Sequence, residues 1–222
     1  MPRLRPLLIA LLALAAALLP SALAAAPPPL PPPPGQVIAA VSADFDRDGQ
    51  TETLQVVMVS GRRWQDQETW CGQGDKWSGQ FVLRLWRGGR LLDQQPFANL
   101  FWPPEQRGQE TFFWAPRFEL VLADYNQDGR LDFNLGQYGT CNGNIYRLFT
   151  VTPAGRLAVL PIEGRWFLFV SPLSRDNSTQ GIKVQGGVLS HTFYDNTQGR
   201  SITSRYRWDG ARFVPLPAKA SP

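Results

Sequence analysis

The chain has 222 residues, with 22 Lys or Arg, 18 Asp or Glu and a formal net charge of +4. This length allows one large or two small domains. The basic residues form no arginine-rich run and no basic helix. The charge therefore speaks against nucleic-acid binding and supports only a weak attraction to acidic partners.

The N-terminal residues have the pattern of a secretory signal peptide. Arg3 and Arg5 form a positively charged region, and residues 7–19 form an apolar stretch too short for a stable membrane anchor. Small residues follow at the expected cleavage point. We therefore expect a signal peptide over 1–25, an extended proline-rich linker over 26–35, an all-β domain over 36–217 and a tail over 218–222. Such a protein is periplasmic or secreted, with no membrane span after cleavage.

Two segments share one pattern of oxygen-bearing side chains. The first places its potential ligands at Asp44, Asp46, Asp48, Gln50 (through its carbonyl) and Glu52. The second places them at Asp124, Asn126, Asp128, Arg130 (through its carbonyl) and Asp132. In each, a glycine after the third ligand permits a sharp backbone turn, so the side chains surround one point. Oxygen ligands without His or Cys favour Ca²⁺.

The surroundings of these segments indicate the kind of loop. An EF-hand needs a glutamate at position twelve and a helix on either side, but Gln55 and Leu135 occupy that position. The flanking residues alternate with the period of two that is typical of strands. We therefore predict two strand–loop–strand calcium sites. The alternative is a pair of ordinary Asp-Gly turns that bind no metal.

From residue 35 onward the pattern is that of short strands separated by turns. The candidate strands are 37–41, 54–59, 81–86, 145–151, 157–160, 166–170, 181–184, 188–194 and 202–208. No segment of about a dozen residues shows helical periodicity. We predict an all-β fold, either propeller-like or a sandwich of short antiparallel strands.

Two long aromatic interruptions divide the strands, at 61–77 and at 97–104 with 112–114. Cys71, in the first, and Cys141 are the only cysteines, so an exported chain is expected to join them in a disulfide. The bond would tie the tryptophans to the segment after the second loop. We predict a partner-binding surface at Trp64, Trp70, Trp77, Tyr138, Asn142, Asn144 and Tyr146. The alternative is an apolar cluster with no binding role.

The loop pattern resembles the FG-GAP/VCBS loops of integrin-type and bacterial β-propeller proteins. Residues 136–149 and the final segment 206–213 are further similar to bacterial periplasmic proteins. Some of those proteins are inhibitors or immunity proteins that block lysozyme-type hydrolases. The resemblance implies a calcium-binding domain with a protein partner, such as a secreted hydrolase.

Little in the sequence indicates catalysis. His191 is the sole histidine, and a lone histidine on a strand is usually structural. The acidic residues outside the two loops form no evident pair of the kind that a glycosidase needs. We expect binding rather than catalysis, with a carbohydrate-active enzyme or its accessory domain, and hence a glycan ligand, as the alternative. Residues 177–179, Asn-Ser-Thr, fit a glycosylation acceptor if the host is eukaryotic.

Overall fold

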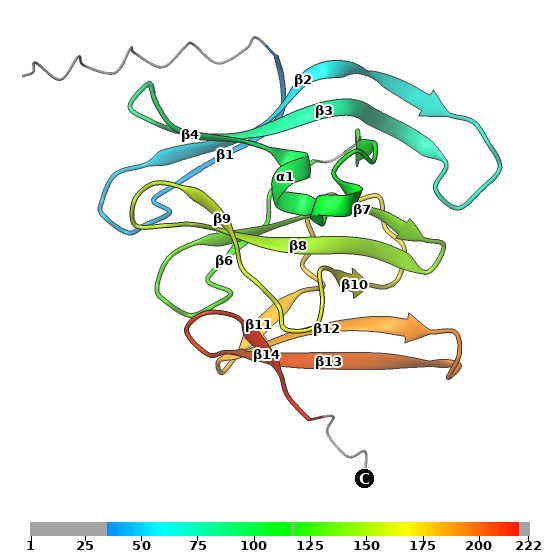
Figure 1. Cartoon of the computed structure of the whole chain (residues 1–222). Helices are drawn as coiled ribbons and strands as arrows, with labels where there is room; N and C mark the ends of the chain where they lie inside the picture. The colour runs from blue at the N-terminus through cyan, green and yellow to red at the C-terminus, as the bar shows by residue number, and fades with distance from the viewer. Residues whose placement is uncertain (1–34, 117, 218–222) are drawn as a thin grey trace, which may run out of the picture. The chain divides into compact units, whose positions relative to one another are not determined.

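The computed structural model describes residues 35–116 and 118–217. The expected signal peptide, nearly all of the linker and the tail lie outside these residues. The described residues form three antiparallel sheets (Figure 1). Sheet A contains β1 (Gln36–Ala43), β2 (Glu52–Asp66), β3 (Gly74–Arg87), β4 (Arg90–Pro96) and β5 (Thr111–Trp114). Sheet B contains β6 (Leu122–Ala123), β7 (Asp132–Thr140), β8 (Gly143–Val151), β9 (Leu157–Val159) and β10 (Leu168–Val170). Sheet C contains β11 (Lys183–Gln185), β12 (Val188–Asp195), β13 (Arg200–Trp208) and β14 (Phe213–Pro215).

Sheets A and B repeat one strand arrangement. In each, an acidic loop joins an edge strand to a long hairpin, β2–β3 in sheet A and β7–β8 in sheet B. Strands β4 and β5 then share the far edge of β3, as β9 and β10 share the far edge of β8. In sheet C a turn at Gly186 and Gly187 joins the first two strands instead of an acidic loop. The repeat places the two acidic loops at equivalent positions.

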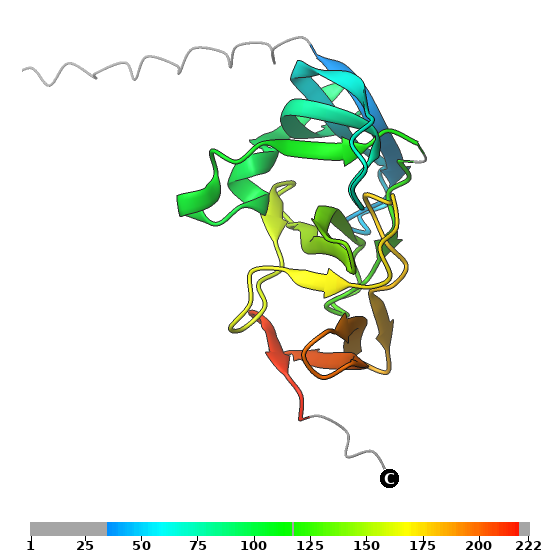
Figure 2. The same cartoon turned by 90° about the vertical axis from the view of Figure 1, so that its right-hand side faces the viewer.

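Sheet B lies between sheets A and C, and both of its faces are buried (Figures 1 and 2). Because side chains alternate along a strand, Phe149 and Val151 of β8 face sheet A while Tyr146 and Leu148 face sheet C. The short helix α1 (Phe97–Phe101) adds two phenylalanines to the core between sheets A and B. A 3₁₀ turn, η1 (Pro104–Gln106), follows it.

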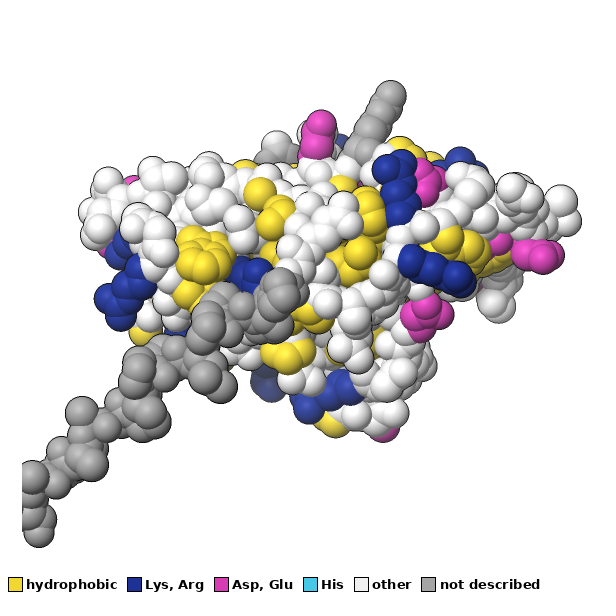
Figure 3. Space-filling model, turned by 90° about the horizontal axis from the view of Figure 1, so that it is seen from above, with side chains coloured by type: hydrophobic (Ala, Val, Ile, Leu, Met, Phe, Trp, Pro, Cys, Tyr) yellow, Lys and Arg dark blue, Asp and Glu magenta, His cyan; other side chains and the backbone are white. Residues whose placement is uncertain are grey.

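The prediction of an all-β fold is confirmed. Among the described residues the sheets do not close into a barrel, and the arrangement fits a sandwich of short strands. On the face shown in Figure 3, basic side chains lie beside hydrophobic ones without merging into one basic patch among the residues described there.

The interruption expected at 61–77 is largely strand, because β2 and β3 continue as one hairpin to its tip between Asp66 and Gly74. Gly61 and Gly79 pair across this hairpin with φ of 134° and 153°. A Cβ on Gly61 would lie 2.1 Å from the carbonyl oxygen of Ser78, so the two strands approach closely only because both residues are glycines. The hairpin therefore carries its tryptophans on a paired framework rather than on a loop.

Candidate metal loops and aromatic surface

The two acidic loops have the same backbone conformation. Arg47 and Gln127, at position four, have φ of 60° and 58°, and Gly49 and Gly129, at position six, have φ of 85° and 91°. In both loops the glycine N–H donates to the first aspartate, Gly49 to Asp44 at 3.0 Å and Gly129 to its counterpart at 2.9 Å. The local spacing of Asp, Asn and Gly thus produces one loop twice.

The last carboxylate of each loop comes from the strand that follows it. Glu52, at the start of β2, accepts a hydrogen bond from the backbone N–H of Phe45 at 2.9 Å. Asp132, at the start of β7, accepts one from the N–H of Tyr125 at 2.8 Å. Both carboxylates are fully buried, at 0% exposure. They lie beneath their loops and fix the loop backbone to the sheet.

In the first loop three aspartates form a group that could hold a metal ion. Oxygen atoms of Asp44, Asp46 and Asp48 lie within 4.8 Å of one another. Arg87, which sequence reasoning missed, already contacts this group from β3. Its guanidinium lies 2.9 Å from Asp46, 2.8 Å from Asp48 and 2.6 Å from Glu52.

In the second loop two carboxylate oxygens are buried without a hydrogen-bond partner among the described residues, Asp124 Oδ1 and Asp132 Oδ1. Burial raises the pKa of Asp132 to about 6, because the ionised form has lost its hydration, and the neighbouring Thr150 hydroxyl only partly opposes this rise. Asp128 is better satisfied, since it accepts from the Asn126 amide at 2.9 Å and pairs with Arg130. The donor set consists of oxygen atoms and fits a hard divalent cation such as Ca²⁺.

The two loops touch each other. The backbone N–H of Leu131 donates to the carbonyl of Phe45 at 2.9 Å. Phe45 packs into the core between sheets A and B, while Tyr125, its equivalent in the second loop, packs into the core between sheets B and C. The conformation of each loop is therefore tied to an inter-sheet core.

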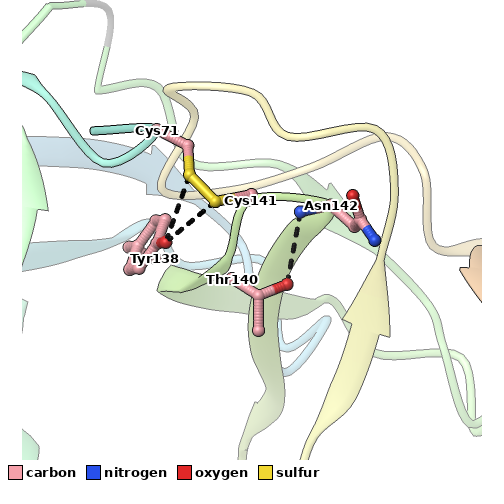
Figure 4. The surroundings of a disulfide bond; sticks show 5 residues. All are labelled: Cys71, Tyr138, Thr140, Cys141 and Asn142. Carbon is pink, nitrogen blue, oxygen red and sulfur yellow. Dashed lines mark hydrogen bonds between the residues drawn. A yellow bond between two sulfur atoms is a disulfide. The ribbon is translucent and has the colours of Figure 1, made fainter. Parts of the chain in front are cut away.

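Cys71 and Cys141 are bonded to each other across 70 residues, with their Cα atoms 5.1 Å apart. The bond joins the tip of the β2–β3 hairpin to the β7–β8 turn, as expected. The Tyr138 hydroxyl lies 3.8 Å from Cys71 Sγ and 3.9 Å from Cys141 Sγ (Figure 4). The Trp70 ring meets the Tyr138 ring edge-on, with centroids 5.0 Å apart.

Beneath Trp70, Lys76 lies among aromatic rings. Its ammonium group is 2.8 Å from Asp66, 4.3 Å from the Trp70 ring centre and 5.3 Å from that of Trp64. Asp66 also accepts from Trp70 Nε1 at 3.0 Å, and the hydrogen bond from Lys76 holds the pKa of Asp66 below its usual range. Trp64 and Trp70 therefore form an internal cation–π contact with the same lysine.

The predicted surface residues lie in different environments. Trp70 is 39% exposed, and Tyr138 and Asn142 are half-buried. Trp77 lies on the opposite face of the hairpin from Trp64; there it stacks with Arg63 and packs against the core between sheets A and B.

The expectation is revised for Asn144 and Tyr146, which are 0% and 1% exposed. Their polar groups bind the backbone of the segment 171–181: the Asn144 amide donates to Ser174 O at 2.6 Å, and the Tyr146 hydroxyl donates to Asp176 O at 3.1 Å. Burial removes both side chains from any surface that a partner could touch.

His191 is buried between sheets B and C. Its Nδ1 lies 2.8 Å from the carbonyl oxygen of Phe169, and its ring stacks against Tyr206. Burial lowers its pKa to about 4, so the imidazole is neutral at pH 7. This environment agrees with the structural role expected of a lone histidine.

Comparisons of the chain with protein-family models, with curated proteins and with solved structures found no match. Within the described ranges, neither helix has the length and apolar character needed to cross a bilayer. The chemistry of the acidic loops and of the aromatic surface is therefore inferred from their own residues.

Proposed function

We propose that this chain is an exported β-domain that binds Ca²⁺ in its acidic loops and acts by binding a partner rather than by catalysis. The observation that supports calcium most strongly is the pair of buried, unpartnered oxygens on Asp124 and Asp132. A buried carboxylate oxygen without a donor is costly, and a divalent cation bound to it would reduce that cost. The loop pattern and its resemblance to FG-GAP/VCBS loops favour the same ion.

The partner surface is proposed at Trp70, Tyr138 and Asn142. The disulfide and the Lys76–Asp66 pair hold this surface in place, so little ordering is needed on binding. A lysozyme-type hydrolase of the periplasm or the extracellular space is the proposed partner, in accord with the resemblance of residues 136–149 and with the disulfide. A glycan is the alternative ligand, because an exposed tryptophan beside a tyrosine also suits a sugar ring.

Calorimetric titration with Ca²⁺ and thermal unfolding with and without chelator test the calcium proposal. Ca²⁺ at 100 times its Kd stabilises the folded state by about 2.7 kcal/mol per site. For a domain of this size the melting temperature then falls by roughly 5–10 °C in chelator. Asp132→Asn keeps an oxygen to accept from Tyr125 N–H but removes the charge, so it should abolish the second loop's share of that difference.

Glu105→Gln, which removes an exposed carboxylate outside both loops, is the matched control and should keep the full chelator effect. Identical melting curves with and without chelator for the unmodified chain, together with no heat of Ca²⁺ binding, would rule out the calcium proposal.

A further inference from the structure

Arg87 contacts three carboxylates of the first loop, whereas in the second loop Arg130 pairs with Asp128 alone. Its Nε donates to Glu52, its Nη2 to Asp46, and its Nη1 lies against Asp48. These are charge-assisted contacts, roughly twice as strong as neutral hydrogen bonds.

Backbone and side-chain donors fill the remaining positions of the first loop. Asp44 accepts from the N–H groups of Asp48 and Gly49, and Asp46 and Glu52 each accept one further backbone N–H. Asp48 accepts from the backbone and the amide of Gln50. Together with Arg87, these donors leave no carboxylate oxygen of the first loop without a partner. In the second loop, Asp124 Oδ1 and Asp132 Oδ1 have no hydrogen bond of this kind.

The repeat explains where this difference comes from. Glu52 faces Arg87 across the β2–β3 pair, and Asp132 faces Thr150 across the equivalent β7–β8 pair. One cross-strand position therefore carries a long cation in the first repeat and a short neutral side chain in the second. Thr150 cannot supply a charge to its loop.

We propose that Arg87 is the resident cation of the first loop and that this residue decides which loop takes a divalent ion. A divalent ion can enter the first loop only by displacing a guanidinium held by three carboxylates, whereas in the second loop it has to displace only the contact of Arg130 with Asp128. This inference rests on the proposed calcium binding. It makes the residue opposite the last carboxylate the determinant of the number of calcium ions per chain.

The role of Arg87 is tested by calorimetric titration of the chelator-stripped chain with Ca²⁺, which gives the number of ions bound per chain. The unmodified chain should bind one ion, and the Arg87→Thr variant should bind two. Adding Asp46→Asn to Arg87→Thr should remove the second ion, because it takes a ligand from the first loop. Thr150→Arg should bind none, and the Arg87→Thr, Thr150→Arg double variant should bind one. Arg90→Thr makes the same change at the exposed cross-strand neighbour of Arg87 and should leave the count at one.

Thermal unfolding gives a second measurement on the same proteins. Arg87→Thr should melt at a lower temperature than the unmodified chain in chelator, because the loop carboxylates then repel one another, and Ca²⁺ should restore much of the loss. Two ions on the unmodified chain, or an unchanged count in Arg87→Thr, would overturn the inference. No ion on the unmodified chain but one on Arg87→Thr would support the role of Arg87 and refute binding in the second loop.

Discussion

The side-chain amide of Asn177 hydrogen-bonds both backbone groups of Trp114. Trp114 N–H donates to Asn177 Oδ1 at 2.8 Å, and Asn177 Nδ2 donates to Trp114 O at 2.7 Å. The carbonyl of Asn177 in turn accepts from Gly136 N–H at 2.8 Å. One residue thus joins the edge of sheet A to β7 of sheet B. Because Asn177 is only 1% exposed, the acceptor sequence at 177–179 is unavailable for glycosylation in the folded chain.

We expect Asn177→Ala to lower the free energy of unfolding by about 3 kcal/mol, because it leaves two buried backbone groups of Trp114 unpartnered. Chemical denaturation monitored by tryptophan fluorescence measures this loss. Asn196→Ala, at an exposed asparagine in the β12–β13 turn, should change the stability by less than about 0.5 kcal/mol. Equal stabilities of the two variants would contradict the role assigned to Asn177.

The acidic loops and the strands could be predicted because their determinants are local. Asp, Asn and Gly at fixed spacing determine the backbone of Gly49 and Gly129, and alternation identifies most strands. Arg87 could not be found in this way, because its hydrogen-bond partners lie 35 and 41 residues away. Its place depends on strand register, which the sequence pattern does not determine at that distance.

The segment 61–77 was misjudged for a different reason. Buried Asp66 and Lys76 stand at positions where a core strand would carry apolar residues, so the segment does not show the usual alternation. Each is satisfied by the other within an aromatic cluster, and this compensation is visible only in three dimensions. Asn144 and Tyr146 show the same limit, since polar residues that suit a surface are buried here against backbone carbonyls.

The disulfide gives a prediction about stability. Replacing both Cys71 and Cys141 by serine should reduce the free energy of unfolding by about 4 kcal/mol, because the crosslink removes the entropy of a long loop from the unfolded chain. Denaturation of the oxidised chain, the reduced chain and the double variant measures the effect. The reduced chain should gain two hydrogens in mass and match the variant in stability. Free thiols in the unreduced chain would show that the bond does not form.

His191 gives a prediction about pH. Its folded-state pKa of about 4 lies below the ordinary value of 6.5, so the unfolded chain binds the proton more readily. The stability that the folded state gains from keeping His191 neutral is therefore fully present above pH 6.5. About 3 kcal/mol of the unfolding free energy is lost as the pH falls toward 4. Asp132, whose pKa is raised to about 6, acts in the opposite direction over part of this range.

The His191→Phe variant separates the effect of His191 on the pH dependence of stability from that of Asp132. His191→Phe retains a flat ring beside Tyr206 but cannot be protonated. The difference in unfolding free energy between the unmodified chain and His191→Phe should shift by about 3 kcal/mol between pH 7 and pH 4, in favour of the variant at the lower pH. Urea denaturation at a series of pH values gives this difference. A difference that stays constant with pH would show that His191 titrates normally.

The partner surface gives the last prediction. Trp70 is exposed above Lys76, and its ring rests edge-on against Tyr138, which lies beside the disulfide. If this surface binds the partner, Trp70→Ala and Tyr138→Ala should each cost about 2 kcal/mol or more, roughly thirtyfold in affinity. Binding to purified lysozyme-type hydrolases and to soluble peptidoglycan fragments is measured by interferometry on immobilised chain. Arg200→Ala, in the β12–β13 hairpin of sheet C, is the control and should bind like the unmodified chain. Circular dichroism and melting curves establish that each variant is folded. If a hydrolase or glycan binds the unmodified chain and all three folded variants equally well, the Trp70–Tyr138 surface is not the binding site.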